Sequence, residues 1–416
     1  MSRRVSVIWL VEHLAREMDV ACAAVALLRA RFGIDAEVHH VYGDAPALLR
    51  EVLPEVVVYP FFYQTQALAL EDYVARWPDA THFNMAWEQV HYPMHEQSKA
   101  PSDAFTRSQV THNAWGPFYR DYLERHGVPA DHIHVNGNPA YGLYAEPYRG
   151  YFDSKEVLAA RYGLDARRRW IFVPENYRWA FLSDKRLRAF GHQGAQAEAE
   201  AFQLREFSRD SLRELLAWCV SLSRNEAIEV IFRTRPATGH DVMREFARAA
   251  LPGGPERMQF IKHGTVREWV LASDVVVSSY STTLAEAAVA GIPCVMAQPM
   301  PIPEALWCDW YGLVPTVRTA DELAEPCLTG LQVADELRQW ARASVIGPGD
   351  PILRVTDTVG RLWLQHRESP PEPPARRPEI APKTYMNPLT HDQDAFTQQD
   401  VDRRVGRWRV HLGLAQ

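Results

Sequence analysis

Short apolar runs alternate with helical repeats along this chain, and this alternation constrains its fold more than any other feature. In the first 150 residues, the runs with the length and composition of buried strands are residues 5–10, 36–41, 56–59, 82–86 and 132–135. Apolar positions recur with helical spacing over residues 15–32, 45–52 and 118–126. This order is typical of a parallel sheet whose strands are joined by crossover helices. We therefore predict an α/β fold.

A second series of the same kind follows a polar joint near residues 147–156. Its expected strands are residues 170–173, 228–233, 258–261, 274–278 and 293–297, with helices over 208–225, 241–250, 266–273 and 282–290. We therefore predict two tandem βαβ domains, over residues 1–150 and 151–350. Beyond them we expect a helix over 351–368, an extended Pro-rich linker over 369–390 and a helical tail over 391–416.

Composition narrows the class of protein. The 416 residues are 47% hydrophobic and carry a net charge of −7, which supports large cores and argues against a dedicated nucleic-acid-binding protein. No stretch reaches the roughly 18 apolar residues that a membrane span needs. The first apolar run stops at Glu12, so we interpret it as a strand and not as a signal peptide. Five scattered cysteines without metal-binding spacing indicate buried thiols in a reducing compartment, which we take to be the cytoplasm.

Ligands of parallel α/β sheets bind beyond the carboxyl ends of the strands, so the loops at those ends hold the candidate site residues. The strongest candidate is the hydroxyl-rich turn after the strand at 274–278, which leads into an Ala-rich helix. Its candidate residues are Ser279, Ser281, Thr282, Thr283 and Glu286. Hydroxyls and backbone N–H groups at a helix N-terminus suit a phosphate, and a nearby carboxylate can accept from ribose hydroxyls. The alternative is that these hydroxyls only cap the helix.

Three further loops of the second half carry polar residues at strand ends. Arg233 and Arg235 follow one strand and point to opposite sides of it, so one of them is expected to hold a diphosphate. Glu175 and Asn176 follow another strand, and His263 follows a third. We predict that these residues contact a ligand at the carboxyl ends of the strands. Surface ion pairing, loop capping or a purely structural histidine would explain the same residues without a ligand.

The first half offers two carboxylates as candidate general bases. Glu12 follows the first strand and stands four residues before Arg16 on one helical face. Glu88 follows Trp87, and an aromatic side chain beside a carboxylate suits a sugar site. Asn138 lies in a turn after the last strand of the first half. Arg16, Trp87 and Asn138 complete the candidates of the first half, although an exposed helix start and ordinary turn chemistry would explain them too.

Several familiar signatures are absent from the sequence. It contains no P-loop, no G-x-G-x-x-G after the first strand and no G-x-S-x-G, which argues against P-loop ATPases, NAD or FAD enzymes and hydrolases of the nucleophile-elbow type. It also lacks H-E-x-x-H, and no D-x-D pair of the kind that can hold a metal follows an expected strand; its two D-x-D runs begin at Asp392 and Asp400, in the expected tail. We therefore expect no metal and no cofactor.

The pattern resembles a known family. Tandem Rossmann-like domains with a hydroxyl turn and Glu286 on the following helix are similar to GT-B glycosyltransferases. The run Val135-x-Gly-Asn-Pro139 is similar to a motif of bacterial surface-polysaccharide enzymes, among them CDP-glycerol glycerophosphotransferases, UDP-GlcNAc 2-epimerase relatives and capsule Kdo transferases. The spacing of Glu12, Arg16, Glu17 and Asp19 resembles the E-x-x-x-R-E-x-D of surface carbohydrate biosynthesis proteins. Where many relatives have Arg-Pro-His-Pro, this chain has Arg-Thr-Arg-Pro from position 233, so Arg235 is expected to replace the histidine.

The resemblance implies a GT-B architecture with a cleft between two domains. It implies metal-independent transfer of a sugar from a nucleotide-activated donor, with CMP-Kdo as one donor, to a glycan or glycolipid acceptor of a bacterial surface. The second domain would bind the nucleotide sugar, which is a co-substrate and donor, through the candidates of the second half. The first would bind the acceptor, with Arg16, Trp87 and Asn138 on the acceptor side and Glu12 or Glu88 as the catalytic base. It also implies a cytoplasmic protein and leaves peripheral association with the inner face of a membrane open. A sugar-nucleotide epimerase and a non-catalytic binding protein of the same fold are the alternatives.

Overall fold

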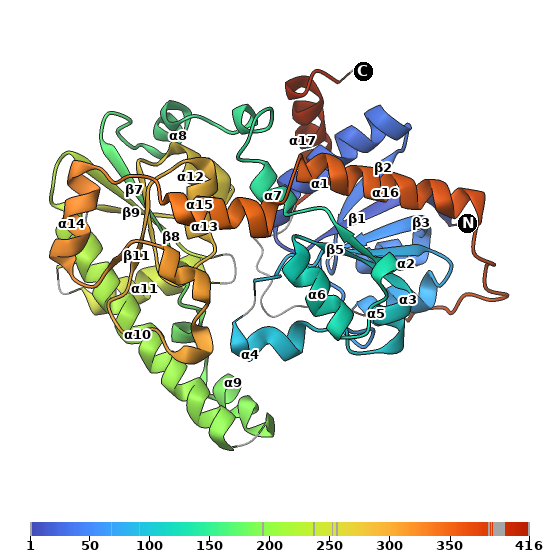
Figure 1. The fold of residues 1–416 in the computed structure, drawn as a ribbon, viewed down its shortest axis with the longest axis horizontal. Coiled ribbons are helices and arrows are strands. Elements are labelled where there is room, and N and C mark those ends of the chain that lie inside the picture. The colour runs from blue at the N-terminus through green and yellow to red at the C-terminus, as the bar shows by residue number, and fades with distance from the viewer. Residues whose placement is uncertain are drawn as a thin grey trace. The chain divides into compact units, whose positions relative to one another are not determined.

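The chain forms two compact units (Figure 1). The structure, a computed structural model, describes residues 2–414 except 68, 91, 194, 236–237, 252, 255–256, 382, 384 and 386–395. The first unit contains Met1–His91, His95–Tyr151 and Arg342–Gln416, and the second contains Tyr92–Met94 and Phe152–Ala341. We expected the second domain to run to residue 350, whereas the chain from Arg342 onward belongs to the first unit.

Among the described residues, the first unit is built on a six-stranded parallel sheet with the strand order β2-β1-β3-β4-β5-β6. Its strands are β1 (Arg3–Val11), β2 (Ala36–His40), β3 (Val52–Tyr59), β4 (Thr81–Asn84), β5 (Val110–Ala114) and β6 (Ile133–Val135). Its helices before the second unit are α1 (Leu14–Phe32), α2 (Ala45–Glu51), α3 (Leu70–Arg76), α5 (Ala104–Ser108), α6 (Pro117–Arg125) and α7 (Pro139–Gly142). The connection between β4 and β5 also contains α4 (Pro93–Glu96).

The sequence analysis missed β5, because polar residues interrupt its apolar pattern. His112 and Asn113 are both fully buried in it. The His112 ring lies within hydrogen-bond distance of the Thr106 carbonyl, at 2.8 Å, and of the Asn84 amide, at 3.2 Å. Burial lowers the pKa of His112 to about 4, so its imidazole is neutral and behaves as a polar core residue.

The second unit repeats this architecture. Within its described residues, a six-stranded parallel sheet has the order β12-β11-β10-β7-β8-β9. Its strands are β7 (Arg169–Pro174), β8 (Ile228–Arg233), β9 (Met258–Ile261), β10 (Val275–Ser278), β11 (Cys294–Ala297) and β12 (Thr316–Val317). Its helices are α8 (Lys155–Tyr162), α9 (Asp184–Arg188), α10 (Ala195–Ser223), α11 (His240–Ala250), α12 (Val266–Ala272), α13 (Thr283–Ala290), α14 (Ala320–Thr329) and α15 (Asp335–Ala341). The predicted class, two tandem Rossmann-like α/β domains followed by C-terminal helices, is confirmed.

The returning C-terminal segment completes the first unit. Helix α16 (Pro351–Glu368) packs against α1 and β3, and α17 (Gln398–His411) packs against α1 (Figure 1). Trp408 of α17 is fully buried and stacks on Tyr151, with ring centroids 3.6 Å apart. Arg404 of the same helix lies 3.2 Å from the buried carboxylate of Asp19 on α1. The predicted helical tail is therefore part of the first unit's core, and its first residues, 391–395, lie outside the described residues.

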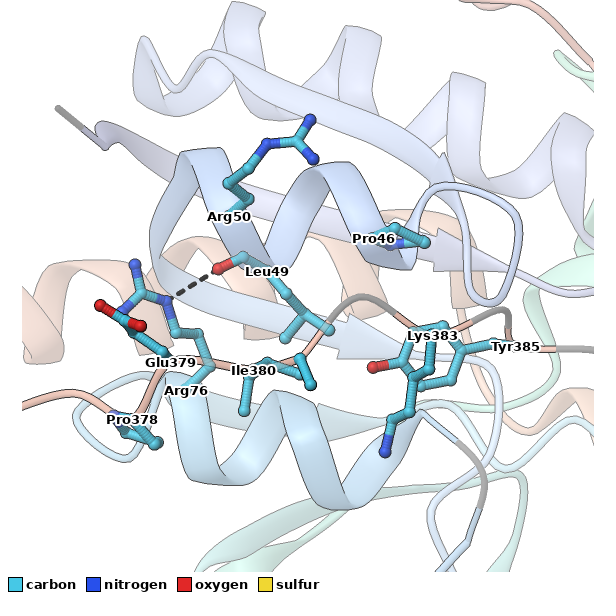
Figure 2. Close-up of a pocket in the computed structure, with 10 residues that line it drawn as sticks. Pro46, Leu49, Arg50, Arg76, Pro378, Glu379, Ile380, Lys383 and Tyr385 are labelled. Atoms are coloured by element: carbon cyan, nitrogen blue, oxygen red, sulfur yellow. Dashed lines mark hydrogen bonds between the residues drawn. The ribbon is translucent and has the colours of Figure 1, made fainter.

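The Pro-rich segment has no regular secondary structure over its described residues, but it is fixed to α3 and the loop after it. Arg377 forms a two-pronged ion pair with Asp79, with N–O distances of 2.7 and 2.6 Å. Tyr385 donates to Asp72, and Lys383 lies 2.6 Å from the same carboxylate. Figure 2 shows the pocket of about 350 Å³ that this segment forms with α2 and α3. We expected a linker with little structure of its own, whereas these contacts make it a strap across the first unit.

Candidate functional site

The predicted residues form two groups, one in each unit. In the first unit, Glu12 lies directly after β1, and Glu88 lies in the loop after β4. Both strands are parallel to β3, which lies between them, so their carboxyl ends meet at one edge of the sheet. Helix α1 begins at Leu14 and supplies Arg16 and Glu17 from its first turn. The sheet topology therefore brings Glu12, Arg16 and Glu88 together.

Arg16 is the centre of this group. Its guanidinium contacts the carboxylates of Glu17 at 2.6 Å, Glu88 at 3.1 Å and Glu12 at 3.4 Å. Glu17 is fully buried, and its other oxygen accepts from the backbone N–H of Glu12 at 2.7 Å. Lys99 forms an ion pair with the second oxygen of Glu88. Glu17 thus holds both Arg16 and the chain at Glu12, which makes it a positioning residue for this group.

The environments of the two candidate bases move their pKa values in opposite directions. Burial raises the pKa of Glu12, and the nearby charges of His13 and Arg16 offset only part of this effect. The Glu88 side chain keeps 51% of its surface exposed. Desolvation would raise the pKa of Glu88 too, but Lys99 and Arg16 overcome it and hold this pKa well below its usual range. Carboxylates whose pKa values are pushed apart take different roles, so Glu12 suits proton transfer and Glu88 suits a permanently ionised role.

The loop that carries Glu88 has an unusual backbone. Ala86 has φ of +46°, the one positive φ at a non-glycine residue within the described chain. Its N–H donates to the Asn84 side chain at 3.0 Å, which helps to hold this turn. Gln89 fixes the far side of the loop, because its amide bonds the carbonyl of Asn113 at 2.9 Å and the N–H of Trp115 at 2.7 Å. Such a strained and over-determined turn is common at functional sites.

Trp87 and Asn138 are not placed as an acceptor surface would require. Trp87 is only 4% exposed, so its ring packs in the core and offers no face to a sugar. Asn138 is 2% exposed, and its side chain accepts from Ala140 N–H at 2.9 Å as the N-cap of α7. Its own N–H donates to the carbonyl of Val345 in the returning segment. Turn chemistry and packing therefore account for both residues.

Gly137 in the same turn gives a prediction of stability. Its φ is +84°, and a Cβ there would lie 2.0 Å from the carbonyl oxygen of Ile346. We expect Gly137→Ala to lower the free energy of unfolding by about 1–3 kcal/mol from backbone strain, and by more because of this clash. Urea unfolding measures the change. Gly127→Ala is the matched control, because Gly127 also has φ of +84° but its Cβ would meet only Arg107 Cδ at 3.5 Å. Equal losses in the two variants would contradict the clash.

In the second unit, the hydroxyl turn connects β10 to α13, as predicted. The Ser281 hydroxyl accepts from Thr283 N–H at 3.3 Å and donates to the Thr283 hydroxyl at 3.2 Å. The Thr282 side chain is exposed, and Glu286 in the first turn of α13 is half-buried. Ser279 is buried, with 2% of its surface exposed. Part of the turn therefore caps the helix, while Thr282 and Glu286 remain accessible to a ligand.

Glu175 and Asn176 stabilise the loops around this turn. Glu175 is 4% exposed, and its two oxygens accept from the N–H groups of Tyr177 at 2.7 Å and Arg235 at 3.0 Å. It therefore ties the loop after β7 to the loop after β8. Asn176 donates to the carbonyl of Tyr280 at 2.7 Å. These contacts give both residues a role in shaping the turn.

The two arginines at the end of β8 have different environments. Arg233 is 4% exposed and donates to the carbonyls of His263 at 2.8 Å and Gly264 at 2.7 Å. Burial lowers the pKa of Arg233 to about 10, and the guanidinium stays charged at neutral pH. Arg235 is half-buried, and its side chain makes no hydrogen bond or ion pair with any residue that the structure describes. Arg235 is thus the better candidate for a ligand anion, whereas Pro236 after it lies outside the described residues.

His263 is exposed, and Arg233 donates to its backbone carbonyl and not to its ring. Lys262 beside it is buried and donates to the carbonyls of Arg235 and Thr238, at 2.7 Å for Thr238. Sequence reasoning missed Lys262 and Lys99, because neither lies in a recognised motif.

Within the described ranges, no cluster of three His, Cys, Asp or Glu side chains is arranged to hold a metal. No helix of the described chain has the length and apolar character of a membrane span.

Several solved structures are similar in fold to this chain. The UDP-GlcNAc 2-epimerase of Neisseria meningitidis, bound to UDP-GlcNAc, matches with a TM-score of 0.51 and 11% identity over 87% of this chain and 100% of that one. The Methanocaldococcus jannaschii UDP-GlcNAc 2-epimerase, in complex with UDP-GlcNAc and UDP, matches with a TM-score of 0.52 and 12% identity over 86% and 100%. The wall teichoic acid polymerase TagF matches with a TM-score of 0.52 and 10% identity over 87% and 90%.

At these identities, the likeness establishes the fold alone. No protein-family model matches the chain, and no curated protein matches it.

Proposed function

We propose that this chain is a metal-independent glycosyltransferase that moves a sugar from a nucleotide-activated donor to a bacterial surface glycan. The observation that carries the proposal is the pair of carboxylates on Arg16, with the pKa of Glu12 raised and that of Glu88 lowered. A buried carboxylate with a raised pKa is suited to remove a proton from an acceptor hydroxyl. The ionised Glu88 keeps Arg16 and Lys99 in place beside it.

The second unit would bind the nucleotide sugar. In the proposed reaction, Glu12 takes the proton of the acceptor hydroxyl, and the acceptor oxygen forms a bond to the anomeric carbon. The bond from that carbon to the phosphate oxygen breaks, and its electron pair leaves with the nucleotide. Arg235 and the N-terminal turn of α13, with Thr282 exposed, would balance the charge of the leaving phosphate. Glu286 would accept from a ribose hydroxyl.

A sugar-nucleotide epimerase is the second candidate, and the fold shared with two UDP-GlcNAc 2-epimerases favours it. An epimerase converts its nucleotide sugar without an acceptor. Incubation of the protein with UDP-GlcNAc alone, followed by NMR of the sugar, separates the two activities. An epimerised nucleotide sugar supports the epimerase, whereas turnover only after a glycan acceptor is added supports the transferase.

The nucleotide site gives a direct prediction. We expect one nucleotide among CMP, CDP, UDP, GDP and ADP to raise the melting temperature of the protein, and CMP tests the CMP-Kdo donor. At about 100 times its Kd, a ligand stabilises the native state by about 2.7 kcal/mol. The shift should be lost or reduced in Glu286→Ala. It should persist in Glu245→Ala, which removes an exposed glutamate from α11. No shift with any of the five nucleotides would contradict a nucleotide-sugar enzyme and favour a non-catalytic protein of this fold.

A further inference from the structure

The carbonyl of Tyr280 lies inside the hydroxyl turn of the second unit and is held by two side chains. Asn176 donates to it at 2.7 Å, and the hydroxyl of Tyr92 donates to it at 2.9 Å. The Asn176 amide also lies 3.3 Å from the Tyr92 hydroxyl, so the three groups form one small network. The Tyr280 carbonyl belongs to the peptide plane that joins Tyr280 to Ser281, so this network fixes the plane that leads into Ser281.

Aromatic packing adds to this support. The Tyr92 and Tyr280 rings meet nearly edge to face, with centroids 6.1 Å apart and an interplanar angle of 70°. The Tyr280 ring is in turn edge-on to Tyr177, at 5.8 Å. Burial raises the pKa of Tyr92, so its hydroxyl keeps a proton to donate throughout the neutral range. Tyr92 thus supports the turn through both its ring and its hydroxyl.

Tyr92 reaches this turn from an unexpected part of the chain. Tyr92–Met94 belongs to the second unit, although the chain on both sides of it belongs to the first. The segment lies in the connection between β4 and β5, shortly after Glu88 in the sequence. The support of the hydroxyl turn is therefore covalently continuous with the loop that carries Glu88.

We propose that Tyr92 is a positioning residue of the nucleotide site: it fixes the hydroxyl turn for the phosphate and transmits nucleotide binding along the chain to the loop of Glu88. This inference rests on the proposed nucleotide site. Without the hydroxyl, the Tyr280 carbonyl keeps one side-chain bond from the described residues, that from Asn176, and the turn becomes less well ordered before the ligand binds. Binding then has to order it, which weakens affinity.

Two measurements test the proposal, with CMP, CDP, UDP, GDP and ADP each as the probe. The first is the Kd by calorimetry, which we expect to rise about 3- to 10-fold in Tyr92→Phe, the range of one net hydrogen bond. The second is amide hydrogen exchange of a peptide covering residues 85–90, which we expect the bound nucleotide to slow in the wild type but not in Tyr92→Phe. If Tyr92 had only a structural role, bound nucleotide would slow the exchange of this peptide equally in the wild type and in Tyr92→Phe.

Tyr148→Phe is the matched control, because it removes a comparable hydrogen bond, 2.7 Å to Asp350, in the first unit. It should leave both the Kd and the exchange effect as in the wild type. Binding with the same Kd and the same exchange effect in Tyr92→Phe would overturn this inference and leave the proposed function standing. The inference would also be overturned if bound nucleotide did not change the exchange of residues 85–90 in the wild type. If none of the five probes binds the wild type, the proposed function itself fails.

Discussion

Glu12→Gln is expected to lower kcat by about 10²- to 10⁴-fold, the range that general base catalysis contributes. Glutamine keeps the size of the side chain and its contact to Arg16 but cannot take up the proton. Glu12 is not among the residues that we assign to the nucleotide, so we expect the loss in kcat to exceed any change in the Kd of the nucleotide. Turnover of the variant near the wild-type level would show that Glu12 is not the base and would favour Glu88.

The pH dependence of kcat/KM follows from the same residue. A base must be ionised, so activity should fall as the pH drops through the pKa of Glu12. Because burial raises that pKa, the acid limb should have its midpoint above about 4.3, the ordinary value for glutamate. If Glu88 were the base instead, its lowered pKa would put the midpoint below that value. The position of the acid limb therefore separates the two carboxylates without any substitution.

Trp408→Ala is expected to have the largest effect on stability, a loss of about 3–5 kcal/mol in the free energy of unfolding. The indole is fully buried and stacks on Tyr151, so its removal leaves a cavity between α17 and the rest of the first unit. Urea unfolding followed by circular dichroism measures the loss. Val410→Ala on the same helix is the control, because Val410 is 84% exposed and should change stability by less than about 0.5 kcal/mol. A small effect for Trp408→Ala would mean that α17 is not part of the cooperative core.

The alternation of strands and helices predicted five of the six strands in each sheet, because β-branched and apolar runs leave few other arrangements. It missed the two-residue β12 and also β5, where the buried His112 ring and Asn113 side-chain oxygen find hydrogen-bond partners elsewhere in the chain. For the site, the carboxyl-end rule selected Glu12 and Glu88, and the sheet places their loops at one edge.

Spacing alone did not distinguish a side chain that faces a ligand from one that faces a neighbouring backbone. Arg233 and Arg235 look equivalent in the sequence, and only the fold reveals that Arg233 is committed to two carbonyls. Trp87 is another such case, because only the fold shows that its side chain is buried. Tyr92 could not have been found from any motif, since its partner Tyr280 lies in a separate part of the chain.

The return of the chain to the first unit has a consequence for biosynthesis. A ribosome releases residues 152–341 before it has made α16, the strap and α17, all of which the first unit needs. Although domains generally fold from the N-terminus as they are synthesised, here the second unit is complete first. Until α16 and α17 are made, the face of α1 that they will cover stays exposed on the nascent chain, and exposed apolar surface promotes aggregation. Termination at residue 341 would therefore release a folded second unit joined to a first unit that lacks part of its core.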